Sequence, residues 1–455
     1  MALPVAAVVE PEPHLGLSAA PVGSVEVANG TFPSIALNHS LRYRVFSPES
    51  PSWPPEYNHT DVDGGSDGMR IVVYVMNLTG VPRPSKASDT AIIQGLIQDG
   101  FLVAVVDYEG ARIQDPLVFQ KDVCLLYFSF GGNLHFPGSS NYMKLMEMRG
   151  PYGGWSSWWH DADRFSSFPF PGNASKRIPI NMGAVYVIPS GYTVAPQVIV
   201  EQGFVIGKSF PRGGHRYIEN AAHYTNVTKL FVDIIFPKAS PGTERVPLLL
   251  EGTTDPLGDF VVNTNTVVLF AWLFNGYALA SMNYVDMEPD SPGWMSAPSY
   301  VNDTASTQAH TIRYLRSQSE RFSLSGKVGT AGLSKSNERT YVESNPPRNS
   351  TAAAGRGGPH EPSDVCVTMP AMGFFGGPAI WDHLVDRSTA HLVLTYAHHN
   401  TYGLNGTQIE QLRDDYLAAG LQDKLLYIDE PLAGHEYNVY HLKEIMAFFD
   451  RFCKP

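Results

Sequence analysis

The sequence predicts an open, mostly parallel α/β sheet. Apolar runs of buried-strand length recur along the chain, helical patterns with one apolar face alternate with them, and short Gly- and Pro-containing turns separate the two. A strand, a helix and a second strand in succession indicate parallel strands covered by the helix. Alternation of this kind through most of a chain is typical of α/β proteins.

Composition bounds the class of protein. A chain of 455 residues can bury a large core, and 43% hydrophobic with 17% charged residues are globular values. The net charge of −12 disfavours nucleic-acid binding, which needs clustered Lys and Arg. No window approaches ~18 uninterrupted apolar residues, so no membrane span is predicted.

Residues 1–68 are predicted to be an irregular leader that contains a strand or two. Pro, Gly and Ser punctuate this segment, with short alternating stretches such as LRYRVFSP between them. The initial stretch MALPVAAVVEPEPHLG has neither a charged n-region nor a full apolar core. We therefore expect a mature N-terminus from which any secretion signal is already absent.

Residues 69–182 are predicted to hold an extra βαβ unit and then an aromatic-rich excursion or lid. IVVYVMNL and FLVAVVDYEG are strand-like, and SDTAIIQGLIQDG between them has one apolar helical face, with Ser88 or Asp89 as N-cap. Trp and Phe crowd residues 152–171, where no period holds. Exposed, these rings could stack on sugars or bind an acyl chain; buried, they would be only the core of a lid.

Residues 183–455 are predicted to form the main domain. VYVIPSGY, QVIVEQGF, KLFVDIIFP and VPLLLEG are successive strands, and a helix over 263–274 precedes the strand GYALASMNY. A helix that begins near Thr304 closes with SQSERF, and the short strand KVGTAG follows. Beyond it come the strands DVCVTMPAMG and HLVLTYAHH, the helix TQIEQLRDDYLAAG, the strand LLYIDEP and a last helix to Phe452. The preceding βαβ unit could extend the same sheet.

One stretch of the first unit is echoed in the main domain. IIQGLIQDGFLVAVVDYEG resembles VLFAWLFNGYALASMNYVD, because each has a helix, a Gly-aromatic pair, a buried strand and an acidic residue. Internal duplication would explain the echo. So would the general likeness of all βα units, and the sequence leaves both explanations open.

Ser334 stands directly after the strand KVGTAG, within GLSKS. In the motif G-x-S-x-G a nucleophilic serine occupies a sharp strand-to-helix turn, where small neighbours permit the strained backbone that exposes Oγ. Gly332, Leu333 and Lys335 fit this motif, and Ser336 stands where the second glycine would be. Serine is small enough to keep the close approach, so Ser334 is a candidate nucleophile.

His435 lies in IDEPLAGHEY, between a short strand and the terminal amphipathic helix. A hydrolase of the type that uses G-x-S-x-G places its general base in such a position, after the serine in chain order. His435 follows Ser334 by roughly a hundred residues. The two residues are therefore a candidate nucleophile–base pair.

Across about residues 183–455 the sequence resembles the α/β-hydrolase superfamily, and within it secreted serine esterases related to acetyl-xylan and other carbohydrate esterases. GLSKS, the AGH that ends at His435, and GYALASMNY before the helix HTIRYLRSQ carry the resemblance. It implies a mostly parallel hydrolase sheet with helices on both faces. It also implies that Ser334 Oγ attacks an ester carbonyl while His435 takes the proton and returns it to the leaving alcohol.

The resemblance also implies an oxyanion hole built from backbone amides. The amide of Lys335 would supply one half. The other half would come from the loop after VPLLLEG, through Gly252, Thr253 or Thr254. Thr254 could instead only cap a turn with Asp255.

The third member of a catalytic triad is a carboxylate, and here the sequence departs from the family. The acid usually follows the strand before the histidine strand, yet no carboxylate occurs between His391 and Gln408, and Asn400 stands about where an Asp is expected. Some members place the acid one strand earlier. Asp382 and Asp386 in GGPAIWDHLVD are then the candidates, although either could be a solvated helix charge. Without an acid, the imidazole loses control of its tautomer.

No cofactor or metal site is predicted. Cys124, Cys366 and Cys453 fit no zinc spacing and allow at most one internal disulfide. The adjacent side chains of His398 and His399 would diverge on a strand, so they do not form a metal pair.

N-glycosylation acceptors are frequent, where roughly three would be expected by chance. Their number favours a secreted, extracellular glycoprotein with N-linked glycans on surface loops. The acceptors are Asn29, Asn38, Asn58, Asn77, Asn173, Asn226, Asn302, Asn349 and Asn405.

These observations favour a secreted serine esterase that acts on carboxylic esters, either small molecules or ester groups carried by a polysaccharide. The missing carboxylate after HLVLTYAHH favours a competitor of another class, a catalytically impaired hydrolase fold that binds a ligand or partner. A peptidase on the same scaffold is a third alternative, since nothing in the sequence distinguishes amide from ester substrates.

Overall fold

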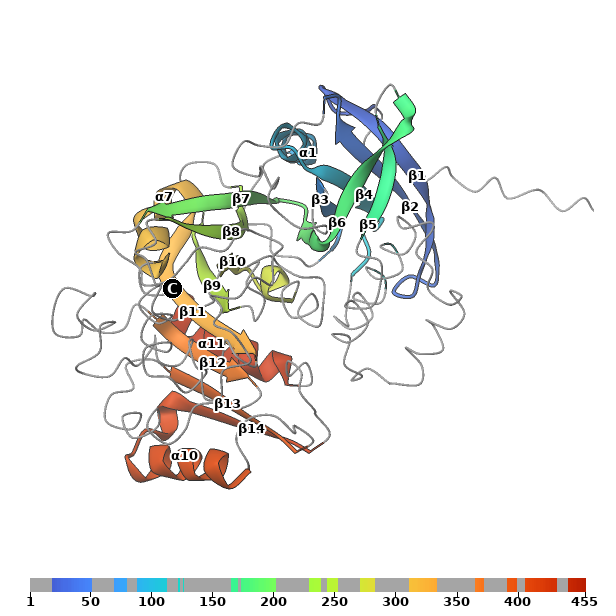
Figure 1. Ribbon diagram of the computed structural model, residues 1–455. Coiled ribbons are helices and arrows are strands. Elements are labelled where there is room, and N and C mark those ends of the chain that lie inside the picture. The colour runs from blue at the N-terminus through green and yellow to red at the C-terminus, as the bar shows by residue number, and fades with distance from the viewer. Residues whose placement is uncertain are drawn as a thin grey trace, which may run out of the picture.

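The computed structural model of the chain contains two β-sheets with helices packed on them (Figure 1). It describes residues 19–50, 69–79, 88–112, 122, 126, 165–170, 173–201, 229–238, 244–252, 271–282, 311–333, 365–371, 391–398, 406–431 and 441–455.

The N-terminal sheet has the strand order β1-β2-β4-β3-β6-β5. In chain order its elements are β1 (Ser24–Ser34), β2 (His39–Pro48), β3 (Met69–Met76), α1 (Asp89–Gln98), β4 (Leu102–Asp107), β5 (Phe165–Phe170) and β6 (Asn173–Pro189). β3 and β4 are parallel neighbours joined through α1, as the sequence predicted. β1 and β2, within the segment predicted as leader, form an antiparallel hairpin that pairs with β4.

The C-terminal sheet has the strand order β14-β13-β12-β11-β9-β10-β8-β7. Its strands are β7 (Tyr192–Glu201), β8 (Lys229–Pro237), β9 (Val246–Gly252), β10 (Ala278–Met282), β11 (Leu324–Leu333), β12 (Val365–Ala371), β13 (His391–Ala397) and β14 (Leu425–Glu430). From β10 to β14 the neighbours are all parallel, whereas β8 is antiparallel to both β10 and β7. The predicted mostly parallel sheet is therefore present, and the N-terminal unit forms a sheet of its own instead of extending it.

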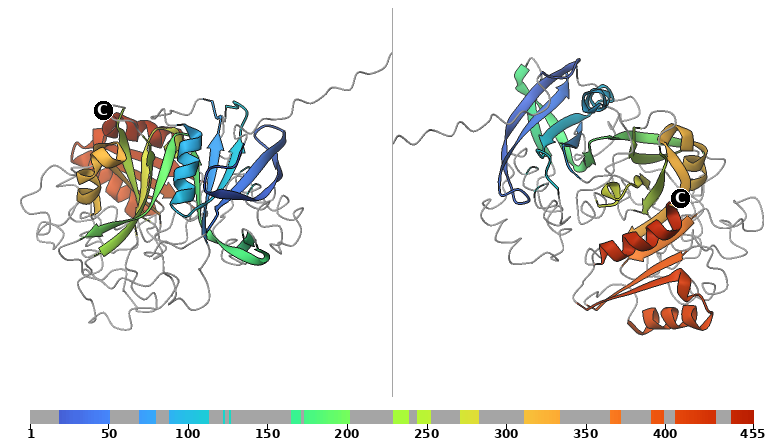
Figure 2. Two further views of the ribbon diagram at one scale, coloured as in Figure 1. Left: turned by 90° about the horizontal axis from the view of Figure 1, so that it is seen from above. Right: turned by 180° about the vertical axis from the view of Figure 1, so that it is seen from behind.

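α1 packs between the two sheets (Figure 2). Ser88 caps its N-terminus, because the Ser88 hydroxyl accepts a hydrogen bond from the amide of Ala91 at 3.2 Å. Ile92, Ile93 and Leu96 are fully buried on the apolar face that the sequence predicted. One continuous apolar cluster includes these side chains together with residues of β7, β8, β9 and β11, so the two sheets share a core.

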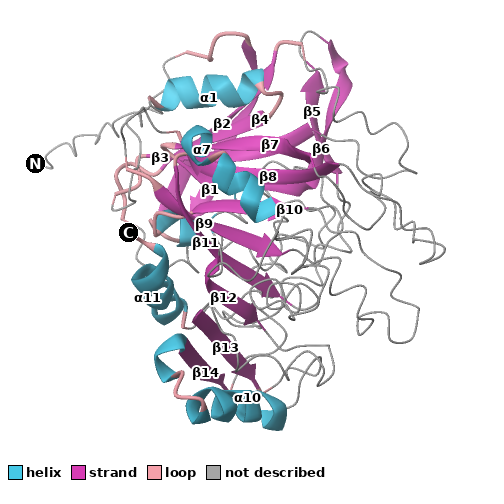
Figure 3. Cartoon of the chain, turned by 90° about the vertical axis from the view of Figure 1, so that its left-hand side faces the viewer, coloured by secondary structure: helices cyan, strands magenta, loops and turns pink. Residues whose placement is uncertain are grey.

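Helices cover both faces of the C-terminal strands, α10 (Gly406–Ala418) on one face and α11 (Leu442–Cys453) on the other (Figure 3). Successive side chains of a strand point to opposite faces of the sheet. Val393 of β13 belongs to the apolar cluster that includes Ile445 and Phe449 of α11. Tyr427 of β14 faces the other way, where the guanidinium of Arg413 of α10 lies 5.0 Å from its ring centroid. The sequence predicted both helices.

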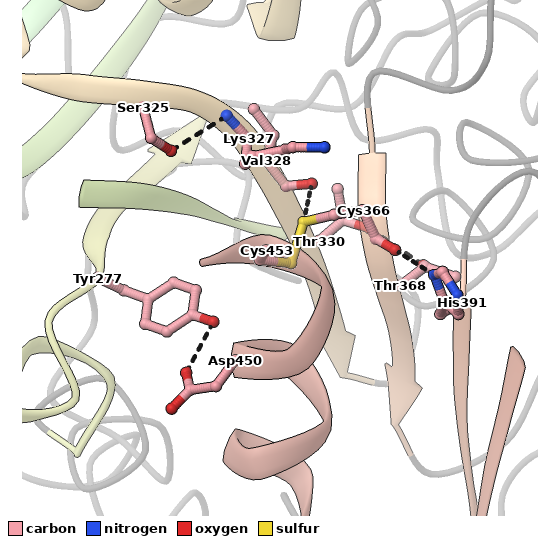
Figure 4. The surroundings of a disulfide bond; sticks show 10 residues. All are labelled: Tyr277, Ser325, Lys327, Val328, Thr330, Cys366, Thr368, His391, Asp450 and Cys453. Carbon is pink, nitrogen blue, oxygen red and sulfur yellow. Dashed lines mark hydrogen bonds between the residues drawn. A yellow bond between two sulfur atoms is a disulfide. The ribbon is translucent and has the colours of Figure 1, made fainter. Parts of the chain in front are cut away.

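A disulfide between Cys366 and Cys453 joins β12 to the end of α11 (Figure 4). The same helix is held a turn earlier, where the hydroxyl of Tyr277 donates to Asp450 at 3.0 Å. Its apolar stripe is buried against β11, and the glycine at position 329 is required there: a Cβ at Gly329 would lie 2.7 Å from the ring of Phe449. α11 is thus fixed to the sheet by covalent, polar and apolar contacts.

The helix predicted from Thr304 is described from residue 311, and it closes with α7 (Ser319–Phe322) before β11 begins. Ile312, Leu315 and Phe322 are buried, so one side of this helical segment is apolar and packed. Among the helices that the structure describes, none is long and apolar enough to span a membrane.

Candidate active site

The central parallel strand β11 ends at Leu333, so Ser334 is the next residue in the chain. Leu333 pairs with Ala371 of β12, and Gly332 lies between Gly252 of β9 and Pro370 of β12. The carboxyl ends of parallel strands meet at one edge of a sheet, and ligands of open α/β sheets bind outside that edge. The predicted nucleophile therefore follows a strand in the middle of the carboxyl edge of the parallel strands.

Two glycines lie side by side at this edge. Gly252 is the last residue of β9 and pairs with Gly332 of β11. Neither carries a Cβ, which leaves room for backbone or substrate to approach the strand ends. Gly252 was predicted to contribute to the oxyanion hole, and it lies one strand away from the end of β11.

Most of the predicted site residues lie outside the described residues. These residues are Ser334, Lys335, Thr253, Thr254, Asp382, Asp386, Asn400 and His435. Their assignments as nucleophile, oxyanion donors, acid and base stay predictions. The strands that precede them are described, and β9, β11, β12, β13 and β14 lie in one run of the sheet.

The segment with His435 connects two well-anchored elements. β14 ends at Glu430, five residues before His435, and α11 begins at Leu442. α11 is tied to β12 by the disulfide and to Tyr277 by Asp450 (Figure 4). The fold therefore fixes both ends of the connection that carries the predicted base.

A histidine–carboxylate pair stands at the same edge of the sheet. Nε2 of His398, the residue after β13, lies 2.6 Å from Oδ1 of Asp429 in β14. Tyr396 and Asp429 are register partners, which brings the two side chains to one face of adjacent strands. The side chains are 42% and 54% exposed, so the pair is open to solvent. The sequence did not reveal this pair, because only the β13–β14 register aligns residues 31 positions apart.

His391 has a structural environment at the opposite edge. It is the first residue of β13, and its ring stacks on Phe452 at a centroid distance of 3.4 Å. Its Nδ1 lies 3.1 Å from the carbonyl of Cys366. Burial lowers the pKa of His391, and the nearby charges of Lys424 and Arg451 lower it further. His391 therefore packs against α11 at the start of β13, at the edge of the sheet away from the strand end that precedes Ser334.

Among the described residues, no group of three or more His, Cys, Asp or Glu side chains is arranged to hold a metal ion.

No family model and no curated protein matches the chain. Solved structures that it resembles include a bifunctional GH43-CE protein of Bacteroides eggerthii, a putative dienelactone hydrolase of Klebsiella pneumoniae subsp. pneumoniae MGH 78578, and the esterase Est2 of Thermogutta terrifontis.

These likenesses are distant. The B. eggerthii protein is 17% identical with a TM-score of 0.34, and the match covers 49% of this chain but only 33% of that one. The K. pneumoniae protein is 12% identical over 57% of this chain and 99% of its own, with a TM-score of 0.36. Est2 is 11% identical over 53% and 92%, with a TM-score of 0.34. At these values the likeness does not extend to activity or substrate.

Proposed function

We propose that the chain is a secreted serine hydrolase that cleaves carboxylic esters through a covalent acyl-enzyme on Ser334. The observation that carries the proposal is the position of this serine in the C-terminal sheet. In chain order β11 is the fifth strand of that sheet and lies at the centre of its parallel run, and Ser334 follows it directly within GLSKS.

The strand order supports an α/β-hydrolase scaffold. The sheet begins with an antiparallel pair, and its third and fourth strands in chain order, β9 and β10, exchange places before the parallel run continues. This fold builds its oxyanion hole from the residue after the nucleophile and from the loop after the third strand. β9 is that third strand, and it ends at Gly252 beside the end of β11. In this fold the histidine of the triad follows the serine in chain order. His435 likewise follows Ser334, and it stands after β14.

The proposed reaction has two halves. Ser334 Oγ attacks the ester carbonyl, His435 takes the hydroxyl proton, and the amides of Lys335 and of Gly252 or Thr253 stabilise the oxyanion. The C–O bond to the alcohol then breaks, and His435 returns the proton to the departing oxygen. Water, deprotonated by His435, attacks the acyl carbon and releases the carboxylic acid with regeneration of Ser334.

The proposed triad acid comes from the segment after β12, where Asp382 is the first candidate and Asp386 the second. The carboxylate would hold the tautomer and orientation of His435. Asp429 is a further candidate, because it is a carboxylate at the same edge that already holds the imidazole of His398.

Secretion is proposed from two features of the chain. The N-glycosylation acceptors exceed chance, and among the described acceptors Asn38 stands in an exposed turn between β1 and β2. Cys366 and Cys453 form a disulfide, which is typical of oxidising compartments. For such a protein the proposed substrates are esters of small molecules or of polysaccharides. The aromatic region 152–171, of which Phe165–Phe170 form β5 of the N-terminal sheet instead of part of an irregular excursion, is the proposed sugar or acyl contact.

A catalytically impaired binding protein is the second candidate function. Asn400 favours it, because this residue stands where the hydrolase family usually has its carboxylate. A peptidase on the same scaffold is a third, since the proposed nucleophile and base would serve an amide as well as an ester.

Hydrolysis of p-nitrophenyl acetate by the full chain tests the proposal. Ser334→Ala and His435→Ala should each lower kcat by about 10³-fold or more. Ser325→Ala, on the strand that precedes Ser334, and His441→Ala, at the start of α11, are matched controls that should retain activity. Full activity in Ser334→Ala would refute the proposal, and a wild type inactive on esters and amides alike would favour the binding protein.

The same assay identifies the acid. Loss of about 10⁴-fold in Asp382→Asn, with Asp386→Asn unchanged, would assign Asp382. The reverse pattern would assign Asp386. If both variants keep their activity and Asp429→Asn loses it, the acid comes from β14 and the assignment to the segment after β12 is wrong.

A further inference from the structure

Two parts of the chain repeat one arrangement of five strands, and the strand labels can be followed in Figure 1. Counted from one edge, the N-terminal sheet has β1, β2, β4, β3 and β6, with β5 beyond them, and the C-terminal sheet has β7, β8, β10, β9 and β11, with β12, β13 and β14 beyond them. Each set consists of two antiparallel pairs followed by two parallel pairs. In each set the third strand along the chain takes the fourth place in the sheet. Order and direction therefore agree at every position.

The hydrogen-bond registers agree as well. Phe46 of β2 lies opposite Val103 of β4, as Ile235 of β8 lies opposite Leu279 of β10. Two residues further on, β2 and β8 both end in a proline. Each proline lies opposite the first residue of the first strand, in the pairs Pro48–Ser24 and Pro237–Tyr192.

The corner before the first strand is the same in both sets. The tripeptides PVG and PSG lead into β1 and β7, and their glycines, Gly23 and Gly191, have positive φ values of 77° and 96°. The residue after the strand-ending proline closes the corner in each case. Glu49 donates its amide hydrogen to the carbonyl of Gly23 at 3.0 Å, and Lys238 donates to Gly191 at 3.0 Å. A bulge follows within the first few pairs of both β1 and β7.

The helices that precede β4 and β10 end in the same way. Gly100 and Gly276 have positive φ values of 88° and 83°, and their amides donate to the carbonyl three residues earlier at 3.0 and 2.9 Å. The helix α10 is closed at Gly420 with the same pattern, so this closure is common and does not by itself indicate a duplication. It supports a duplication here because one shift of 176 residues relates both Gly100 to Gly276 and Val103 to Leu279.

Equivalent side chains are buried equivalently. On one face of each sheet the matched residues belong to the core that both sheets share, and on the other face they belong to a separate apolar cluster of each sheet. The pairs of the shared core are Phe46 and Ile235, Val72 and Leu249, and Val103 and Leu279; those of the separate clusters are Val45 and Ile234, Val73 and Leu250, and Ala104 and Ala280.

General rules of βα units explain only part of this agreement. The right-handed crossover accounts for two parallel strands joined by a helix. It requires neither an antiparallel hairpin on the same side, nor a strand-ending proline, nor a Pro-x-Gly corner closed by the same hydrogen bond. The sequence echo between IIQGLIQDGFLVAVVDYEG and VLFAWLFNGYALASMNYVD falls on the same equivalent positions.

We infer that the chain contains two copies of one five-stranded unit, the product of an internal duplication, and that only the second copy carries a nucleophile. Val75 pairs with Pro189 in the first copy as Gly252 pairs with Gly332 in the second. Two residues after Gly332 stands Ser334. Two residues after Pro189 stands Gly191, which has no side chain and opens the second copy.

The first copy therefore has no nucleophile at this position. It also has no counterpart, among the described residues, of the parallel strands β12, β13 and β14 that precede the predicted acid and base. Its described contribution to the second copy is packing, through α1 against β7. The statement about the nucleophile rests on the proposed function, whereas the duplication stands on the strand order and registers alone.

An experimental structure of the full-length Ser334→Ala variant tests the duplication. One rigid superposition should align each of the five strands of the first set with its equivalent in the second, at the residue pairs given above. The connections from β4 to β6 and from β10 to β11 should cross the same face of their sheets. A register offset at any of the residue pairs given above, or crossovers on opposite faces of the two sheets, would overturn the duplication.

Intact mass after saturation with a fluorophosphonate tests the single nucleophile. The wild type should gain one adduct per chain and Ser334→Ala none. An adduct on residues 21–190 of Ser334→Ala would overturn the claim for the first copy. A wild type that takes up no adduct would refute the proposed function and the claim for the second copy, while the superposition would still decide the duplication.

Discussion

The disulfide between Cys366 and Cys453 should contribute a large part of the stability of the C-terminal sheet. The two cysteines are 87 residues apart in the chain, so the bond closes a long loop in the unfolded state. In the chain-entropy treatment a loop of this length stabilises the folded state by about 4 to 5 kcal/mol. The perturbation is the double variant Cys366→Ser/Cys453→Ser, in which no unpaired thiol remains at either position.

Urea unfolding of the wild type and the double variant, followed by tryptophan fluorescence, measures the difference. We expect the free energy of unfolding to fall by about 4 kcal/mol with little loss of secondary structure, since α11 keeps its apolar stripe and its hydrogen bond to Tyr277. Reduction of the wild type with dithiothreitol should reproduce the effect and leave the double variant unchanged. A difference below about 1 kcal/mol would refute the reasoning from loop length.

Three further changes test other parts of the fold. Gly329→Ala places a Cβ 2.7 Å from the buried ring of Phe449, and we expect the free energy of unfolding measured in urea to fall by about 1 to 3 kcal/mol. Gly95→Ala is the control, because this glycine lies in the interior of α1 with only Lys238 Nζ near its added Cβ, and the change should be neutral or stabilising. Burial lowers the pKa of His391 below its ordinary value of 6.5, so the unfolded chain binds a proton more readily than the folded chain. The free energy of unfolding should therefore fall as the pH drops below about 6.5, and His391→Gln should show a flatter dependence of this free energy on pH. An equal slope in the wild type and the variant would contradict the contribution of His391. The buried carboxylate of Asp122 accepts hydrogen bonds from Ser34 Oγ at 2.6 Å and from the amide of Ile35 at 2.5 Å. Asp122→Asn should therefore lower the thermal stability by about 1 to 3 kcal/mol. No loss of stability in this variant would contradict a stabilising role for these two hydrogen bonds.

Much of the C-terminal sheet could be predicted from local patterns. Runs such as VPLLLEG and HLVLTYA are apolar because strands covered on both faces have no solvent side, and their length identifies them as strands. Apolar stripes likewise identified α10 and α11. The position of Ser334 after β11 could be predicted because the nucleophile motif and the strand before it are contiguous in the chain.

Features that depend on pairing between distant segments could not be predicted. The sequence allowed any pairing of its cysteines, and only the packing of α11 on β12 brings Cys366 and Cys453 together. The separation into two sheets depends on β6 pairing with β3 while β7 pairs with β8, although two residues separate β6 from β7. The pairing of His398 with Asp429 depends on strand register in the same way.

The most direct test of the central claim is to locate the serine that a fluorophosphonate modifies in the wild-type chain. Cleavage with trypsin after Lys327 and Lys335 releases the peptide VGTAGLSK, whose single serine is Ser334. We predict that this peptide carries the phosphonyl adduct and that His435→Ala forms it at least about 10³-fold more slowly. Modification of any other residue, with VGTAGLSK recovered unmodified, would contradict the assignment of Ser334 as the nucleophile.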